Sequence, residues 1–118
     1  MKQKFIEGLT EDFSVRIIKL YKYLQNEQNE FVMSKQILRS GTSVGANVSE
    51  AEGGISKKEF RAKMQIALKE IRETKYWLRL FRRTDYISEN QFDSIYSDAS
   101  MVEATLVKII KGSQNSEE

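Results

Sequence analysis

The chain has 118 residues, with 19 Lys and Arg against 17 Asp and Glu and no Cys, His or Pro. This length allows one domain with its own hydrophobic core. Without Cys there is no disulfide or thiolate nucleophile, and without His there is neither the usual general base near neutral pH nor the Glu-x-x-His motif of di-iron bundles. Catalysis would have to rest on carboxylates, Lys, Tyr or an external cofactor, so we expect a protein that is not an enzyme and needs no cofactor.

The sequence also carries no signal for export or membrane insertion. The N-terminal residues contain no apolar run of the length that a signal peptide needs. No segment approaches the roughly 20 apolar residues of a membrane span. We therefore expect a soluble, cytoplasmic protein with no membrane partner.

Apolar residues recur about every 3.6 positions through most of the chain, which is typical of an all-α domain. A first helix is expected at about residues 10–26, with Thr10 as its N-cap. The polar residues 25–30 interrupt the pattern and predict a loop. A second helix is expected at about 34–52, ending at Gly53 and Gly54.

Two capping boxes predict two more helices. In a capping box, a Ser and a Glu or Gln three residues later accept hydrogen bonds from each other's backbone N–H groups. Ser56–Glu59 opens a helix that should continue to about residue 84, and Ser88–Gln91 opens one that should end at Gly112. Met101 lies on the apolar stripe of this last helix and is expected in the core. Short connections predict an up-down-up-down antiparallel four-helix bundle. We expect a single domain over residues 1–118, with an ordered core at about 9–112 and a disordered tail at 113–118.

The second helix has two special features. Gly41 and Gly45 each cost about 1 kcal/mol against Ala inside a helix, which predicts close approach of another backbone. Beside the apolar stripe runs a stripe of polar side chains. We expect its members to make hydrogen-bonded contacts with Glu70 or Glu73 of the third helix, within the bundle or across subunits, because buried charges must be paired. The members expected to make these contacts are Arg39, Ser43, Asn47 and Glu50. Simple exposure and a small-ligand pocket are the alternatives.

The third helix carries most of the positive charge. Residues 56–84 contain ten Lys and Arg against three Glu, while the rest of the chain has nine basic and fourteen acidic residues. Nine of the ten cations fall in one arc of about 140° on a helical wheel. This arc is either a surface that contacts phosphates, a plain solvated face, or a surface for an acidic protein partner. The candidate nucleic-acid-binding residues are Lys58, Arg61, Lys69, Arg72, Lys75, Arg79, Arg82 and Arg83.

A second surface on the third helix brings apolar and acidic residues together. Trp77 lies on one stripe with Ile66 and Leu80, beside Glu70 and Glu73. A helix of a monomeric bundle needs only one buried stripe, and Trp is favoured at subunit contacts. These residues are therefore candidates for subunit or interhelix contacts. Glu50, Glu70 and Glu73 could in principle hold a hard cation such as Mg²⁺ or Ca²⁺. We expect no metal, because the chain has no His and because the helical periodicity places Arg39 and Lys63 near these carboxylates.

One motif also carries a resemblance. Arg39-Ser40, the run from Ser43 to Glu50, and then Phe60, Ala67 and Glu70 resemble the bacterial four-helix-bundle family named after the intervening-sequence protein of 23S rRNA genes. The resemblance covers about residues 13–106, and the stretch 51–54 departs from the plainer Glu-Gly helix end of that family. It implies a ring-shaped homo-oligomer and no established activity. Related accessory variability determinant proteins of diversity-generating retroelements imply a pentamer that works with nucleic acid.

Together these observations predict a non-catalytic four-helix-bundle protein that forms a homo-oligomer and binds RNA or DNA through the basic arc of its third helix. The alternative is a structural or scaffolding oligomer whose basic surface meets an acidic protein partner. The two differ in whether nucleic acid or protein co-purifies with the chain.

Overall fold

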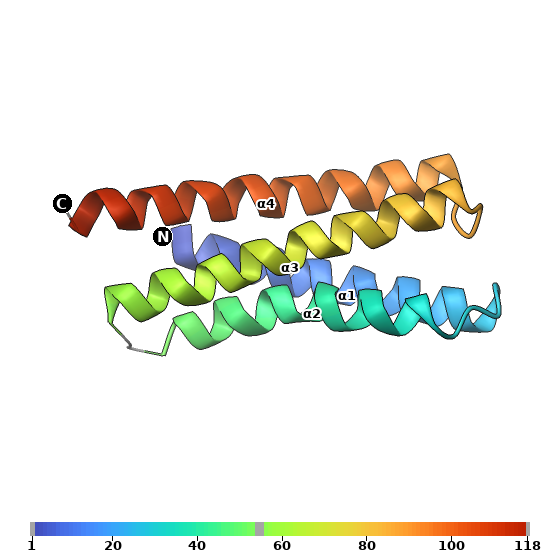
Figure 1. Ribbon diagram of the computed structural model, residues 1–118, viewed down its shortest axis with the longest axis horizontal. Coiled ribbons are helices and arrows are strands. Elements are labelled where there is room, and N and C mark those ends of the chain that lie inside the picture. The colour runs from blue at the N-terminus through green and yellow to red at the C-terminus, as the bar shows by residue number, and fades with distance from the viewer. Residues whose placement is uncertain (1, 54–55, 118) are drawn as a thin grey trace.

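The computed structural model describes residues 2–53 and 56–117. Within these residues the chain forms four helices: α1 (Lys2–Asn26), α2 (Met33–Ala51), α3 (Lys57–Arg83) and α4 (Glu89–Glu117). Consecutive helices run in opposite directions along the long axis of a body that measures 49 × 22 × 19 Å (Figure 1). The prediction of an all-α bundle of four helices is confirmed.

The core forms where the apolar stripes of the four helices meet. A fully buried Leu, Ile, Val or Phe contributes about 1.5–3 kcal/mol, so this stripe-to-stripe packing is the main source of stability. The side chains with no exposed surface include Ile6, Ile17, Leu24, Ile37, Val44, Val48, Met64, Ile71, Leu78, Phe81, Val102 and Leu106. Met101 is 52% exposed, so its predicted place in the core is wrong.

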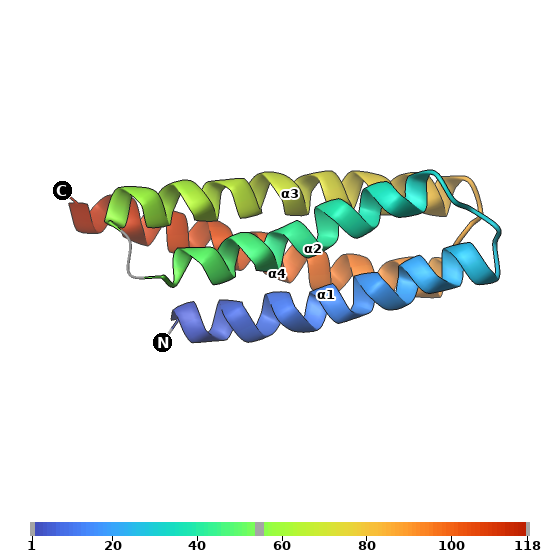
Figure 2. The ribbon, with the colours of Figure 1, turned by 90° about the horizontal axis from the view of Figure 1, so that it is seen from below.

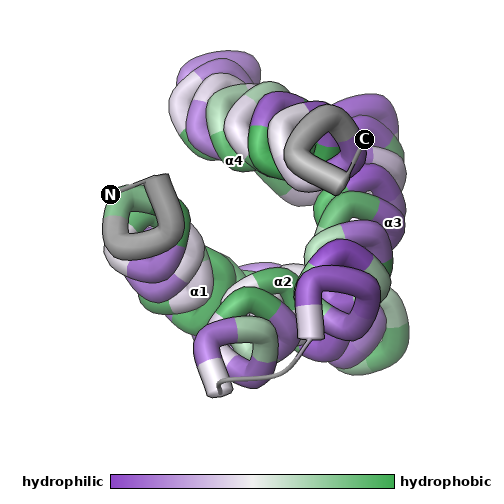
Figure 3. Tube along the Cα trace, turned by 90° about the vertical axis from the view of Figure 1, so that its left-hand side faces the viewer, coloured by the Kyte–Doolittle hydropathy of each residue, from purple (hydrophilic) through white to green (hydrophobic). Residues whose placement is uncertain are grey.

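The helices pack in chain order, and α1 and α4 share far fewer contacts than the other neighbouring pairs. Figure 2 shows α2 between α1 and α3, and Figure 3, seen along the bundle, shows α1 and α4 standing apart on one side. Arg16 of α1 joins them, because its guanidinium lies 2.5 Å from the Asp98 carboxylate and 3.0 Å from the Ser94 hydroxyl of α4. None of the helices in the described part of the chain has an apolar stretch long enough to cross a membrane.

The two glycines of α2 lie where α1 comes closest. A Cβ at Gly45 would lie 3.3 Å from the backbone carbonyl oxygen of Thr10, so the expected close approach of a backbone is present there. A Cβ at Gly41 would lie 2.7 Å from Cγ1 of Ile17, a buried side chain. Gly41 therefore makes room for a side chain of α1 and not for its backbone.

Both predicted helix starts are confirmed, the first by the Ser half of its capping box and the second by a complete box. The Ser56 hydroxyl accepts the Glu59 amide at 3.1 Å, and the Ser88 hydroxyl accepts the Gln91 amide at the same distance. At Ser88 the box is complete, since the Gln91 side chain accepts the Ser88 amide at 2.7 Å.

The start of α2 depends on Glu30, which lies at the end of the predicted loop. Glu30 is buried, and its carboxylate accepts the amides of Met33 at 3.1 Å and Ser34 at 2.7 Å. The Ser34 hydroxyl donates back to the Glu30 carbonyl at 2.9 Å. An acid that accepts several amides at a helix N-terminus satisfies donors that have no partner within the helix and also meets the positive end of the macrodipole. Glu30 therefore stabilises the first turn of α2.

Two predicted helix ends are wrong. The first helix begins at Lys2 and not at Thr10, because the Thr10 hydroxyl is buried and donates to the Ile6 carbonyl at 2.8 Å, which is a mid-helix bond and not a cap. At the other end, α4 continues past Gly112 to Glu117, so the predicted stop at Gly112 is wrong. A single exposed Gly costs about 1 kcal/mol and does not end a helix by itself. The predicted stop at Gly54 and the last residue of the tail, Glu118, lie outside the described residues.

Candidate functional site

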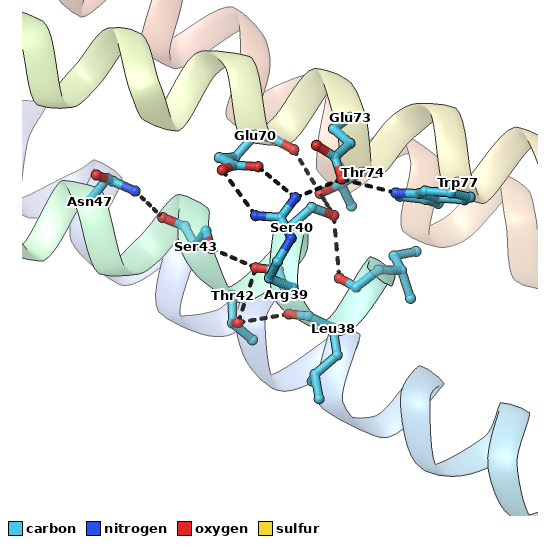
Figure 4. A network of polar contacts seen from close by, with 11 residues as sticks. Leu38, Arg39, Ser40, Thr42, Ser43, Asn47, Glu70, Glu73, Thr74 and Trp77 are labelled. Atoms are coloured by element: carbon cyan, nitrogen blue, oxygen red, sulfur yellow. Dashed lines mark hydrogen bonds and ion pairs between the residues drawn. The ribbon is translucent and has the colours of Figure 1, made fainter. Parts of the chain in front are cut away.

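The first group of site residues joins α2 to α3, and we call it the polar cluster: Arg39, Glu70, Glu73 and Trp77 (Figure 4). The Arg39 guanidinium donates to the Glu70 carboxylate at 3.2 Å and to the Glu73 carboxylate at 2.7 Å. The Trp77 indole N–H donates to the same Glu73 oxygen at 3.1 Å. One arginine of α2 thus holds two carboxylates of α3, and one of these carboxylates orients the indole.

The polar cluster is at the surface. The Arg39 side chain is 50% exposed, while those of Glu70 and Glu73 are 16% and 34% exposed. Hydrogen bonds from Arg39 to Glu70 and Glu73 raise the pKa of the arginine. Burial acts to raise the pKa of Glu73, but hydrogen bonds from Trp77 and Arg39 outweigh it and leave that pKa below its ordinary value. The expectation of a buried ion pair is therefore corrected to a half-exposed one, which contributes much less to stability.

The rest of the polar stripe of α2 makes other contacts within the chain. The Ser43 hydroxyl donates to the Arg39 carbonyl at 2.6 Å, and the Asn47 amide donates to the Ser43 carbonyl at 2.8 Å. Glu50 accepts Lys63 of α3 at 2.7 Å. Within one chain, the expected contact with Glu70 or Glu73 is thus made by Arg39, while these three side chains bond elsewhere. Figure 4 shows the bonds of Arg39, Ser43 and Asn47.

A buried polar contact that the sequence reasoning missed lies next to the polar cluster. Thr74 of α3 and Ser40 of α2 are both fully buried. The Thr74 hydroxyl lies 2.9 Å from the Ser40 hydroxyl and donates to the Glu70 carbonyl at 2.8 Å. The signal in the sequence is a Ser beside Arg39 on the polar stripe of α2 and a Thr on the apolar stripe of α3, and it does not tell which residue pairs with which.

The basic arc of α3 divides into two parts, and one part faces α4. Lys75 Nζ lies 2.7 Å and Arg72 Nε lies 2.8 Å from the Glu103 carboxylate of α4. Arg82 lies 3.5 Å from Asp85. These three members of the predicted nucleic-acid surface are thus engaged by acids, and Lys75, at 16% exposure, is mostly covered.

Glu103 is the centre of this α3–α4 contact. Hydrogen bonds from Lys75 and Arg72 lower its pKa despite partial burial. Lys75 Nζ also lies 4.8 Å from the centroid of the Tyr96 ring, and the Tyr96 hydroxyl accepts Arg79 at 2.9 Å. The sequence placed Arg72, Lys75 and Arg79 on one arc, but it did not reveal that α4 provides partners for them.

The other part of the arc points outward, and we call it the basic face. Its cationic side chains are all exposed, and the exposed ring of Tyr76 lies among them. The members are Lys58, Lys69, Arg72, Arg79 and Arg83. Arg72 and Arg79 belong here although each contacts α4: the Arg72 side chain remains 58% exposed beside Glu103, and Arg79 remains exposed while it donates to Tyr96. Arg61, the remaining candidate, is half-buried and has a partner of its own.

Two further features bear on ligands. Next to the basic face, Ile66 is 42% exposed and Trp77 is half-buried, so the second apolar stripe of α3 does reach the surface.

A polar hollow between α1 and α2 is lined by Glu7, Thr10, Glu11, Ser14, Gly45 and Ser49. It includes none of the polar-stripe residues, so it does not match the small-ligand alternative. Over residues 2–53 and 56–117, no group of three or more acidic side chains is arranged to hold a metal ion.

The fold and surface define a four-helix bundle with a charged outer face on α3. Residues 7–108 match the 23S rRNA-intervening sequence protein family, and the chain belongs to that family. Among solved structures it is similar to a protein of unknown function from the S23 ribosomal protein family of Bacteroides thetaiotaomicron. The two are 53% identical, the match covers 94% of this chain and 99% of the other, and the TM-score is 0.92. No curated protein matches the chain.

Proposed function

We propose that this protein is a non-catalytic homo-oligomer that binds RNA or DNA through the basic face of α3. The observation that carries the proposal is the outward placement of five exposed Lys and Arg side chains along one helix. Clustered cations displace the counterions condensed on a phosphate backbone, and this release is the main source of sequence-independent affinity. The names of the family and of the structural relative refer to 23S rRNA and to a ribosomal protein, which agrees with RNA as a ligand.

The charge distribution supports this assignment against a plain solvated face. Residues 56–84 hold ten of the 19 basic residues of the chain and three of its 17 acids. Glu103 already neutralises part of the side that faces α4, yet the outward side keeps its cations exposed. In a closed oligomer the potentials of several such faces would add.

The test measures binding of a labelled structured RNA and a matched DNA duplex by fluorescence polarisation between about 50 and 300 mM salt. The wild-type protein should lose affinity steeply as salt rises, with a log–log slope of about −0.9 for each duplex phosphate contacted. The triple variant Lys69→Gln, Arg79→Gln, Arg83→Gln should bind more weakly and reduce the slope by about 2–3. All three side chains are exposed, and in the described part of the chain Arg79 contacts α4 through a neutral partner, the Tyr96 hydroxyl, so their loss should leave the fold intact.

A matched control removes the same charge from another face. Lys19 and Lys22 of α1 and Lys35 of α2 are exposed and lie outside α3. Changing all three to Gln should leave both affinity and salt slope as in the wild type. Equal losses in the two triple variants would mean that only net charge matters. No binding by the wild type at the lowest salt would overturn the proposal.

The homo-oligomer is proposed on a different observation, the exposed apolar side of α3. Ile66 is 42% exposed beside the half-buried Trp77, and aromatic residues are enriched at the centre of subunit contacts. The resemblance to ring-forming relatives suggests five subunits. Sedimentation velocity should give a mass well above the 13.7 kDa of one chain, and Ile66→Glu should lower it. A monomer at all concentrations would refute this part.

A scaffolding oligomer with an acidic protein partner is the second candidate. The observation in its favour is that Arg72, Lys75 and Arg82 already take carboxylate partners within the chain. Purified protein with high absorbance at 260 nm would favour nucleic acid, whereas partners that survive nuclease treatment would favour the scaffold.

A further inference from the structure

Tyr76 is the tyrosine that the fold leaves in solvent. Tyr76 is 47% exposed, while Tyr21, Tyr23, Tyr86 and Tyr96 are half-buried against the bundle. An aromatic side chain buries 150–250 Å² when it packs fully, so an outward ring forgoes much of the stabilisation that the core offers. The fold therefore does not account for an aromatic residue at this position.

The exposed ring is held in place by its neighbours. The ring centroids of Tyr76 and Trp77 are 5.3 Å apart with an interplanar angle of 66°, which is an edge-to-face contact. The Trp77 indole is oriented by its hydrogen bond to Glu73, and Glu73 is held by Arg39. The polar cluster thus supports Tyr76 from one side, so that little side-chain entropy is lost when another ring stacks on it.

Cations surround the ring along the helix. Arg72 lies four residues before Tyr76 and Arg79 three residues after it, spacings that bring side chains to within about 5–6 Å at Cβ. Lys69 and Arg83 lie seven residues away in each direction, about 10 Å along the axis. All four are exposed. A base lying on Tyr76 would therefore have a positive group close to the phosphate on either side.

We propose that the basic face binds single-stranded nucleic acid, with an unpaired base stacked on Tyr76 and its flanking phosphates on Arg72 and Arg79. Positive charge that follows the backbone, combined with aromatic rings that stack on bases, is the arrangement by which single strands are bound without sequence preference. In a duplex the base faces are covered by the neighbouring pairs, so Tyr76 adds nothing there and only the charges act. This inference rests on the proposed function and goes beyond it, since charge alone does not distinguish one strand from two.

The experiment compares Tyr76→Leu with Tyr76→Phe in the full-length protein. The probes are a labelled unstructured oligouridine, the corresponding single-stranded DNA, and blunt RNA and DNA duplexes of equal length at about 100 mM salt. Loss of one stacked base weakens binding by about 5- to 150-fold, so Tyr76→Leu should show a loss of this order for the single strands. Tyr76→Phe keeps the ring and should bind as the wild type. Both variants should keep the wild-type salt slope and duplex affinity, because neither changes a charge.

A second readout reports on the site directly. Trp77 is the one tryptophan of the chain and touches Tyr76, so its emission should change when a base stacks there. The oligouridine should therefore alter Trp77 fluorescence in the wild type and in Tyr76→Phe, and duplexes should not. Far-UV circular dichroism checks that each variant is folded.

Three results would overturn the inference, and they are distinguishable. If Tyr76→Leu binds single strands as the wild type does, the basic face works by charge alone and the proposed function stands. If Tyr76→Leu instead lowers the sedimentation mass, Tyr76 belongs to a subunit contact and not to a ligand site. If the wild type binds none of the four probes even at about 50 mM salt, the proposed function fails together with this inference.

Discussion

Replacing Glu103 by Gln tests whether the ion pairs between α3 and α4 stabilise the fold. The variant keeps the size of the side chain and removes the charge that Lys75 and Arg72 share. Exposed ion pairs contribute about 0.2–1 kcal/mol, and breaking a buried pair costs about 3–5 kcal/mol. Lys75 and Glu103, at 16% and 23% exposure, lie between these limits. Arg72 is 58% exposed, so solvent screening reduces its share to a few tenths of a kcal/mol. We expect Glu103→Gln to lower the free energy of unfolding by about 2 kcal/mol near pH 7.

The loss should depend on pH in a definite direction. Because the folded protein lowers the pKa of Glu103, the stabilisation is fully present above the unfolded pKa of about 4.3 and disappears as pH falls through the folded pKa. Wild type and variant should therefore converge in acid. Urea unfolding, followed by circular dichroism and Trp77 emission between about pH 7 and pH 3, gives the free energy at each pH.

Glu50→Gln is the matched control. Glu50 also joins two helices through a 2.7 Å contact, to Lys63, but its side chain is 58% exposed. Its replacement should cost less than about 0.5 kcal/mol. A loss of unfolding free energy in Glu103→Gln no larger than that in Glu50→Gln, or equal at both ends of the pH range, would contradict this prediction.

Three further substitutions test other parts of the bundle by urea unfolding. Gly41→Ala places a methyl group 2.7 Å from the buried Ile17 side chain and should destabilise the fold by about 1–2 kcal/mol. Gly8→Ala, with nothing within 4 Å, should stabilise the fold by up to about 1 kcal/mol. A gain in stability at both sites would show that α1 moves freely. Glu30→Ala should cost about 1–2 kcal/mol and speed hydrogen exchange at the first turn of α2, and unchanged exchange there would show that Glu30 is no cap. Arg39→Ala should lower the free energy of unfolding by at most about 1 kcal/mol because the side chain is half exposed, and it should shift Trp77 emission because Arg39 holds Glu73. A loss of several kcal/mol would mean that Arg39 is buried in an oligomer.

Local signals predicted the helices well where the relevant atoms lie close together in sequence. The boxes at Ser56 and Ser88 are bonds between residues three apart, so the sequence alone located these helix starts. The same logic failed at Thr10, where the apolar stripe continues toward the N-terminus through the buried Ile6, and at Gly112, where a single Gly did not end the helix. A residue that can cap a helix marks its end only when packing of one more turn against the core does not stabilise a longer helix.

The candidate site was predictable as a set of faces but not as a set of contacts. Helical periodicity placed Arg39 on a polar stripe and the Lys and Arg of α3 on one arc, since each depends on positions along a single helix. Which cations remain exposed depends on how α3 is rotated against α4. Glu103, 28 residues beyond Lys75 in the chain, neutralises one side of the arc and leaves the other outward.

By itself, then, the sequence determined the four amphipathic helices, their approximate order in a bundle and the concentration of positive charge on the third. Only the tertiary structure decided that Lys75 is covered, that Tyr76 stands exposed beside Trp77, and that Arg39 holds Glu73 at the surface. The physical reason is range. Helix formation is governed by interactions over three or four residues, whereas the partner and the exposure of a side chain depend on the distance, rotation and register of helices that are far apart in the chain.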